Sequence, residues 1–144
     1  MIRKRIDFFE SSGMLRIRQT DREKIKSLIT SAKINADVVK KIKVDELSST
    51  VIFREIYESI RQLGDVQWWL IGYEPLNHEV SLEILKEIEI KEKIKLNHLA
   101  RFKKIRNDIN YRGFRATVVQ AQEILSFWNS CGKEIIEITE SKIK

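Results

Sequence analysis

The feature that most constrains the fold is the scarcity of residues that break helices. The chain contains one proline, Pro75, and five glycines among 144 residues. Because proline and glycine are the residues that most often interrupt a helix, this scarcity favours long helices with short connections. Apolar residues also recur at steps of three and four along almost the whole chain, which is the spacing of helices that each bury one face.

This spacing predicts an all-α antiparallel bundle of about five to six helices. A short first helix ends near Gly13, and Asp21 caps a second one. Ser48 or Ser49 caps a long third helix that ends at Gly72, and Asn77 caps a short fourth. The buried stripe of the second helix is formed by Ile25, Leu28, Ile29, Ala32, Ala36, Val39 and Ile42.

Two further helices complete the predicted bundle. The apolar face of the fifth helix is formed by Ile94, His98, Phe102, Ile105 and Ile109. That of the sixth, which continues past Gly132, is formed by Val118, Ala121, Leu125 and Trp128. Across the bundle we expect these side chains to be buried: Ile29, Ile56, Ile60, Ile105 and Leu125. No segment shows the alternation of a strand and no linker divides the chain, so residues 1–144 are predicted to form a single domain.

Composition limits the environment in which such a chain works. With 42% hydrophobic and 33% charged residues, and no apolar run long enough to cross a bilayer, the sequence is typical of a soluble globular protein. The basic N-terminus is not followed by an apolar signal core, so we expect a cytoplasmic protein with no membrane partner. Cys131 is the only cysteine, which excludes an intrachain disulfide and predicts a small core residue.

Neither histidine predicts a metal site, and no cofactor-binding motif is present. His98 falls in line with the apolar face of the fifth helix, so we expect a partly buried, hydrogen-bonded histidine. His78 follows the cap Asn77 and is interpreted as a helix-start residue. Trp68 and Trp69 are adjacent, so only one of them can face the core, and the other is available to a partner.

Positive charge is concentrated in the centre of the sequence. The segment from Lys91 to Arg115 contains nine Lys and Arg residues against Glu92 and Asp108, a net charge of +7, whereas the whole chain carries +6. Such a concentration indicates an anionic partner such as RNA or a nucleotide. The alternative is an ordinary solvated helix face.

The most informative part of this segment is residues 106–113. On a helical wheel Lys103, Arg106, Asn107, Asn110 and Tyr111 share one arc, opposite the apolar face. Arginine binds phosphate bidentately, asparagine both donates and accepts, and tyrosine stacks on bases. The predicted nucleic-acid-binding residues are Lys103, Arg106, Asn110, Tyr111, Arg112 and Arg115. No catalytic base is visible among them, and Asp108 is expected to pair with Arg112.

An Arg-Asn pair late in a small helical bundle resembles the HEPN superfamily (higher eukaryotes and prokaryotes nucleotide-binding). Segment 57–65 is similar to the second long helix of that family, and segment 72–79 resembles the turn and short helix that follow. The resemblance covers roughly residues 20–140. It implies a helical bundle that forms a homodimer and is paired with a small nucleotidyltransferase as a toxin–antitoxin system.

Active members of that family are metal-independent endoribonucleases with an Arg-polar-x-x-x-His signature. The resemblance therefore assigns catalytic positions to Arg106, Asn107 and Tyr111, with Tyr111 standing where the family has histidine. A modifiable tyrosine of the nucleotidyltransferase-paired branch would fall at Gly113. The expected function is an RNase-like toxin component that binds RNA or nucleotide and cleaves weakly or not at all. The alternative is a non-enzymatic protein-interaction module with a basic docking face.

Overall fold

The computed structural model describes residues 2–143, and 73% of the chain is helical. The helices that form the bundle are α2 (Arg22–Lys40), α3 (Ser49–Leu70), α5 (His98–Arg112), α6 (Val118–Phe127) and α7 (Lys133–Lys142). Two further α-helices are α1 (Ile2–Ser11) and the four-residue α4 (His78–Ser81). Single turns of 3-10 helix occupy Ile84–Glu87 and Lys93–Asn97. The predicted all-α class is confirmed.

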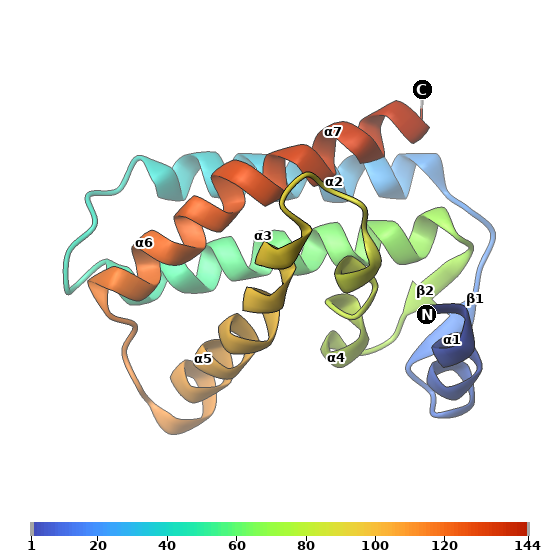
Figure 1. Cartoon of the computed structure of the whole chain (residues 1–144), viewed down its shortest axis with the longest axis horizontal. Helices are drawn as coiled ribbons and strands as arrows, with labels where there is room; N and C mark the ends of the chain where they lie inside the picture. Colours follow the sequence, from blue (N-terminus) through green and yellow to red (C-terminus); the bar gives the residue numbers. More distant parts are fainter. Residues whose placement is uncertain (1, 144) are drawn as a thin grey trace.

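Helix α3 runs through the centre of the bundle (Figure 1). It packs antiparallel against α2 on one side and contacts α5, α6 and α7 on the others. The α6–α7 rod crosses over α3, and α5 lies on the opposite, lower side of α3 in this view. The main core is formed where these helices meet, and a second small core of Phe9, Leu15, Trp68, Val80 and Ile84 holds α1 against the far end of α3.

Local sequence explains where several helices begin. The carboxylate of Asp21 accepts a hydrogen bond from the backbone N–H of Lys24, which caps α2 as predicted. Asn77 caps α4 in the same way through the N–H of Val80. Thr117 and Gln120 form a reciprocal capping box at the start of α6.

Helices α6 and α7 form one continuous rod, as predicted for the last helix. They are joined by a turn of π-helix, Trp128–Gly132. A Cβ at Gly132 would lie 2.8 Å from the Trp128 ring, so glycine permits this turn to pack against the indole. Cys131 is buried in the main core, which confirms its predicted role.

The prediction that the chain has no strand is wrong. Strands β1 (Leu15–Ile17) and β2 (Tyr73–Pro75) pair antiparallel, with Arg16 opposite Glu74. Each strand has three residues, which is too short for alternation to be recognisable in sequence. Their pairing depends on long-range contact between segments that lie more than fifty residues apart.

The predicted start of the fifth helix is also wrong. Residues 93–97 form a turn of 3-10 helix, and α5 begins only at His98. The changed geometry rotates Ile94 away from the core, so that its side chain is 78% exposed. His98 is exposed rather than partly buried, and its ring stacks on Phe102 at a centroid distance of 6.0 Å.

Three side chains of the predicted core lie at its edge. Ile42 follows the end of α2 and is exposed, because the helical spacing no longer applies beyond Lys40. Ile105 and Leu125 are half-buried against the main core instead of fully buried. Ile29, Ile56 and Ile60 are buried as predicted.

The adjacent tryptophans have different environments. Trp68 is fully buried, and its indole N–H donates to the Val80 carbonyl at 2.9 Å. Trp69 is half-buried, with the Lys24 ammonium 5.9 Å from its ring centroid. Trp68 thus belongs to the second core, whereas Trp69 packs at the edge of the main core, so the two rings do not face one core. Every helix within the described residues is too short or too polar to cross a bilayer.

Candidate functional site

The cationic side chains of α5 differ in their partners. Most of them form ion pairs, namely Arg101 with Glu123, Lys103 with Glu79, Lys104 with Asp108, and Arg112 with Asp108. The predicted Asp108–Arg112 pair is present, with an N···O distance of 3.8 Å. Within residues 2–143, Arg106 is the one cation of α5 that makes no ion pair with a carboxylate.

The Arg106 guanidinium lies half-buried between α5 and α3. Its central carbon is 5.8 Å from the centroid of the Tyr57 ring, a cation–π contact. One terminal N–H donates to the side-chain oxygen of Asn107 at 3.3 Å. Its other N–H groups have no hydrogen-bond acceptor among the described residues, so most of the planar donor fork is available to a ligand.

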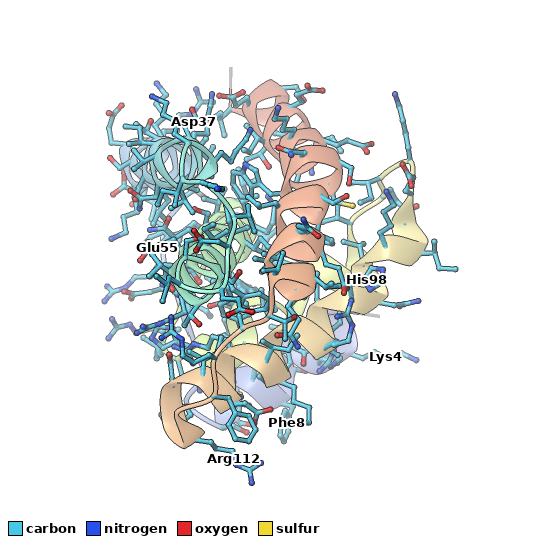
Figure 2. The ribbon with its side chains drawn as sticks, turned by 90° about the vertical axis from the view of Figure 1, so that its left-hand side faces the viewer. Lys4, Phe8, Asp37, Glu55, His98 and Arg112 are labelled. Atoms are coloured by element: carbon cyan, nitrogen blue, oxygen red, sulfur yellow. The ribbon has the colours of Figure 1, made fainter. Side chains whose placement is uncertain are left out.

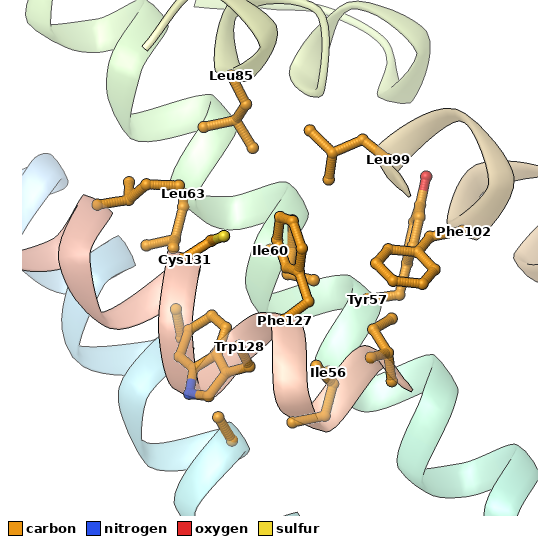
Figure 3. Packing of buried hydrophobic residues seen from close by; sticks show 14 of the residues in the cluster. Ile56, Tyr57, Ile60, Leu63, Leu85, Leu99, Phe102, Phe127, Trp128 and Cys131 are labelled. Carbon is orange, nitrogen blue, oxygen red and sulfur yellow. The ribbon is translucent and has the colours of Figure 1, made fainter. Parts of the chain in front are cut away.

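Tyr57 forms the floor beneath this guanidinium. Its ring is buried beside Phe102, and Figure 3 shows its hydroxyl pointing away from Ile56 and Trp128, at the edge of the core. Burial raises the pKa of Tyr57 to about 12, although the nearby charges of Arg106 and Arg61 oppose the shift. The phenol is therefore neutral near pH 7, where it can donate a hydrogen bond but cannot act as a base.

A closed ionic network lies beside Tyr57 on α3. Arg61 donates to Glu58 at 3.1 Å and to Asp65 at 2.8 Å, and the Ser81 hydroxyl donates to Asp65 at 2.5 Å. The hydrogen bonds from Arg61 lower the pKa of Glu58, while burial raises that of Asp65. Arg61 is therefore satisfied by two carboxylates, and it is not available to bind an external anion in the way that Arg106 is.

Helix α4 closes this side of the site because it approaches α3 very closely. A Cβ added to Gly64 would lie 1.9 Å from the Ser81 carbonyl oxygen, so only glycine permits the contact. Glu79 links α4 to α5 through Lys103, with an N···O distance of 3.4 Å. His78 starts α4 as predicted and is exposed, and its charge contributes to the lowered pKa of Glu58.

The C-terminal end of α5 is a firmly anchored turn. Gly113 adopts a left-handed conformation, with φ of 69°, and ends the helix. The Phe114 N–H donates to the Asp108 carbonyl at 3.2 Å, and the Ala116 N–H donates to the Thr50 hydroxyl at 3.0 Å. Arg115 donates to the Leu47 carbonyl at 3.0 Å. Figure 2 shows Arg112 at this end of the molecule, well away from Asp37 on α2.

The structure divides the predicted site residues into two groups. Lys103, Arg106 and Asn107 are half-buried, and Lys103 and Arg106 contact residues of α4 and α3 respectively. Asn110, Tyr111, Arg112 and Arg115 are exposed near the end of α5. Because α5 is unbroken from His98 to Arg112, Arg106 and Tyr111 point about 140° apart and do not converge within one chain.

Several participating residues were not recognised from the sequence. The sequence places Tyr57 in segment 57–65 of the third helix and gives no signal that its ring lies beneath Arg106. The signal for the network was the recurrence of Glu58, Arg61 and Asp65 at steps of three and four on an otherwise apolar helix. Phe114 lies just beyond the predicted motif and gave no helical signal.

Comparisons of the chain with protein-family models, with curated proteins and with solved structures find no significant match. Among residues 2–143 no three side chains of His, Cys, Asp or Glu are grouped so as to hold a metal ion.

Proposed function

We propose that the protein binds RNA or a nucleotide, with Arg106 as the main phosphate ligand. The observation that carries this proposal is a half-buried guanidinium that rests on the Tyr57 ring and makes no ion pair among the described residues. Desolvating a cation costs free energy, so a partly buried arginine without a carboxylate is well suited to an external anion. Such a site gains its missing partner when phosphate binds.

The surrounding residues support an extended anionic ligand. Segment 91–115 carries a net charge of +7, which concentrates positive potential around α5. Asn107 and Lys103 lie beside Arg106, where an amide and an ammonium would add contacts to phosphate or ribose. Asn110, Tyr111, Arg112 and Arg115 are exposed at and just beyond the C-terminal end of α5, where an extended ligand that bends around the helix would meet them.

The resemblance to the HEPN superfamily makes the proposal more specific. We place the protein among RNase-like toxin components that act as homodimers and pair with a minimal nucleotidyltransferase. Metal-independent cleavage by the natural chain is weak or absent, because the position of the family's histidine is occupied by Tyr111. Tyr57 does not replace it, because its raised pKa keeps the phenol protonated.

A salt-titrated RNA-binding experiment tests this function. Fluorescence anisotropy of a labelled RNA should show binding that weakens with increasing salt. Arg106→Ala should reduce affinity at least tenfold, whereas the matched control Lys95→Ala should have a small effect, since Lys95 is already paired with Glu92. Salt-independent binding, or equal effects of the two substitutions, would contradict the proposal. Capture of one protein partner with no affinity for RNA would instead favour a protein-docking module.

A further inference from the structure

Two exposed aromatic side chains flank the cap of α5. Tyr111 is 76% exposed in the last turn of the helix, and Phe114 is 54% exposed just after Gly113. Large apolar rings usually lose most of their exposure on folding, because burial of apolar surface is favourable. Here both rings remain on the surface at the most basic part of the chain.

Hydrogen bonds anchor the segment that carries Phe114. The Phe114 N–H donates to the Asp108 carbonyl of α5. The Arg115 side chain donates to the Leu47 carbonyl, just before α3, and the Ala116 N–H donates to the Thr50 hydroxyl on α3. A rigid segment pays little conformational entropy when a ligand binds, so an aromatic ring displayed on it is preorganised for contact. The exposure is therefore a property of an anchored turn rather than of a loose loop.

A third side chain extends this surface. The Arg112 guanidinium lies 5.3 Å from the centroid of the Phe114 ring. Arginine planes and aromatic rings both stack on nucleobases, and together they form a surface that is apolar and positively charged. A purely apolar surface would favour a protein partner. Here the aromatic rings alternate in sequence with Arg112 and Arg115, and such a surface favours a polyanion that carries aromatic groups.

We propose that Tyr111, Arg112 and Phe114 form a platform on which unpaired bases of RNA stack, so that the protein selects single strands over duplexes. This inference rests on the proposed function of Arg106 as a phosphate ligand. Arg106 and Tyr111 are separated by about 7.5 Å along the helix axis and point about 140° apart around it, so a single strand that contacts both must bend around the end of α5. In a duplex the bases are already stacked on one another and cannot lie on a protein surface without unpairing.

The test compares a labelled single-stranded oligouridylate with an RNA duplex of the same length. The single strand should bind wild type at least tenfold more tightly than the duplex does. Phe114→Leu should weaken single-strand binding by about tenfold and leave duplex binding unchanged, because leucine keeps apolar area but cannot stack. Phe114→Trp should retain the affinity, and Phe8→Leu serves as the control, since Phe8 is an equally exposed ring on α1.

The outcomes separate the two proposals. Suppose that RNA binding depends on Arg106. If Phe114→Leu then has no effect, or if the single strand and the duplex bind with equal affinity, the stacking platform is wrong and the phosphate site at Arg106 is retained. If wild type binds neither RNA, both proposals are wrong. A direct readout is the fluorescence of a 2-aminopurine base in the strand, which should be quenched by wild type and Phe114→Trp and not by Phe114→Leu. Matching circular dichroism melts would establish that each variant folds.

Discussion

Two arginines near Tyr57 illustrate how similar side chains come to have different roles. Arg61 on α3 is held by Glu58 and Asp65, and its side chain is only 14% exposed. Arg106 on α5 has the Tyr57 ring and Asn107 as neighbours but makes no ion pair within the described residues. The first arginine is satisfied by carboxylates of its own helix, whereas most donors of the second have no acceptor among the described residues.

This difference shows that positive charge alone does not identify a binding residue. Arg61 contributes to the apparent charge of the region, yet its carboxylates neutralise it locally. Most cations of α5 are likewise paired, and those pairs are exposed and weak. The informative feature of Arg106 is partial burial without an ion pair among the described residues: the charge of Arg106 helps to lower the pKa of Glu58, but the guanidinium makes no direct contact with that carboxylate.

The largest expected effect comes from placing a titratable group at position 111. Tyr111→His should raise metal-independent RNA cleavage about 100-fold or more, because imidazole transfers protons near neutral pH. The assay is cleavage of labelled RNA with EDTA present, with Arg106→Ala as the inactive control. Efficient cleavage by wild type that Arg106→Ala does not reduce would place the site elsewhere.

The same variant tests assembly, because Arg106 and Tyr111 point apart within one chain. A double variant with both Tyr111→His and Arg106→Ala should be inactive by itself. Mixed with wild type, it should regain cleavage, since its new histidine would meet Arg106 of the partner subunit across a dimer axis. No recovery in a mixture that light scattering shows to be dimeric would exclude a shared site.

A second prediction compares how much the free energy of unfolding falls when each of the two arginines is replaced. Arg61→Met should lower the free energy of unfolding by about 2–4 kcal/mol, because it leaves Asp65 buried without its ion pair. Arg106→Met should cost less than about 1 kcal/mol, since no carboxylate loses a partner. Urea denaturation followed by circular dichroism measures both values. Equal losses would show that Arg106 is as structural as Arg61.

A third prediction separates the charge of Arg106 from its shape. Arg106→Lys keeps the charge but loses the planar donor fork, so RNA affinity should fall roughly three- to tenfold, less than for Arg106→Ala. The dependence of binding on salt should remain nearly unchanged, because it reports the number of charges in contact with phosphate. A lysine variant as weak as the alanine variant would contradict the role of charge, and one as strong as wild type would contradict bidentate binding.

The smallest effect concerns pH. Hydrogen bonds from Arg61 lower the pKa of Glu58, so the folded state binds a proton there less readily than the unfolded chain does. The resulting stabilisation is complete above the unfolded pKa, about 4.3, and is lost as pH falls through the lower folded value. Glu58→Gln should therefore flatten the acid side of the stability curve by a few tenths of a kcal/mol. Burial raises the pKa of Asp65, so this residue contributes a slope of the opposite sign to the dependence of stability on pH. An unchanged curve for Glu58→Gln would contradict this contribution.

Much of the fold was predictable because the apolar spacing and the capping residues of helices can be recognised in the local sequence. Asp21 and Asn77 cap helices where the sequence indicated, and Ile29, Ile56 and Ile60 are buried as their spacing required. The errors occur where the chain departs from α-helical geometry. Ile94 is exposed in a 3-10 turn, and the three-residue strands pair over a long sequence separation.

The candidate site was predictable only in part. Its chemistry was visible, because Arg106, Asn107 and Tyr111 stand together in a basic segment. Their division into a half-buried group and an exposed group was not, because it depends on how α5 lies against α3 and α4. The local sequence does separate Arg61, which has Glu58 and Asp65 at helical steps of three and four, from Arg106, which has no acidic residue at those steps. It does not indicate that Arg106 lies against Tyr57.

The sequence by itself determined the all-helical class, most of the core and the basic character of α5, because periodicity, capping and charge are local properties of the chain. The tertiary structure decided which cations pair between helices, such as Lys103 with Glu79, which aromatic rings stay exposed and where α4 closes the site. These features depend on distances between segments far apart in sequence, such as the contact of Arg106 with Tyr57 and the close approach of Gly64 to Ser81. Those distances are set only when the helices pack.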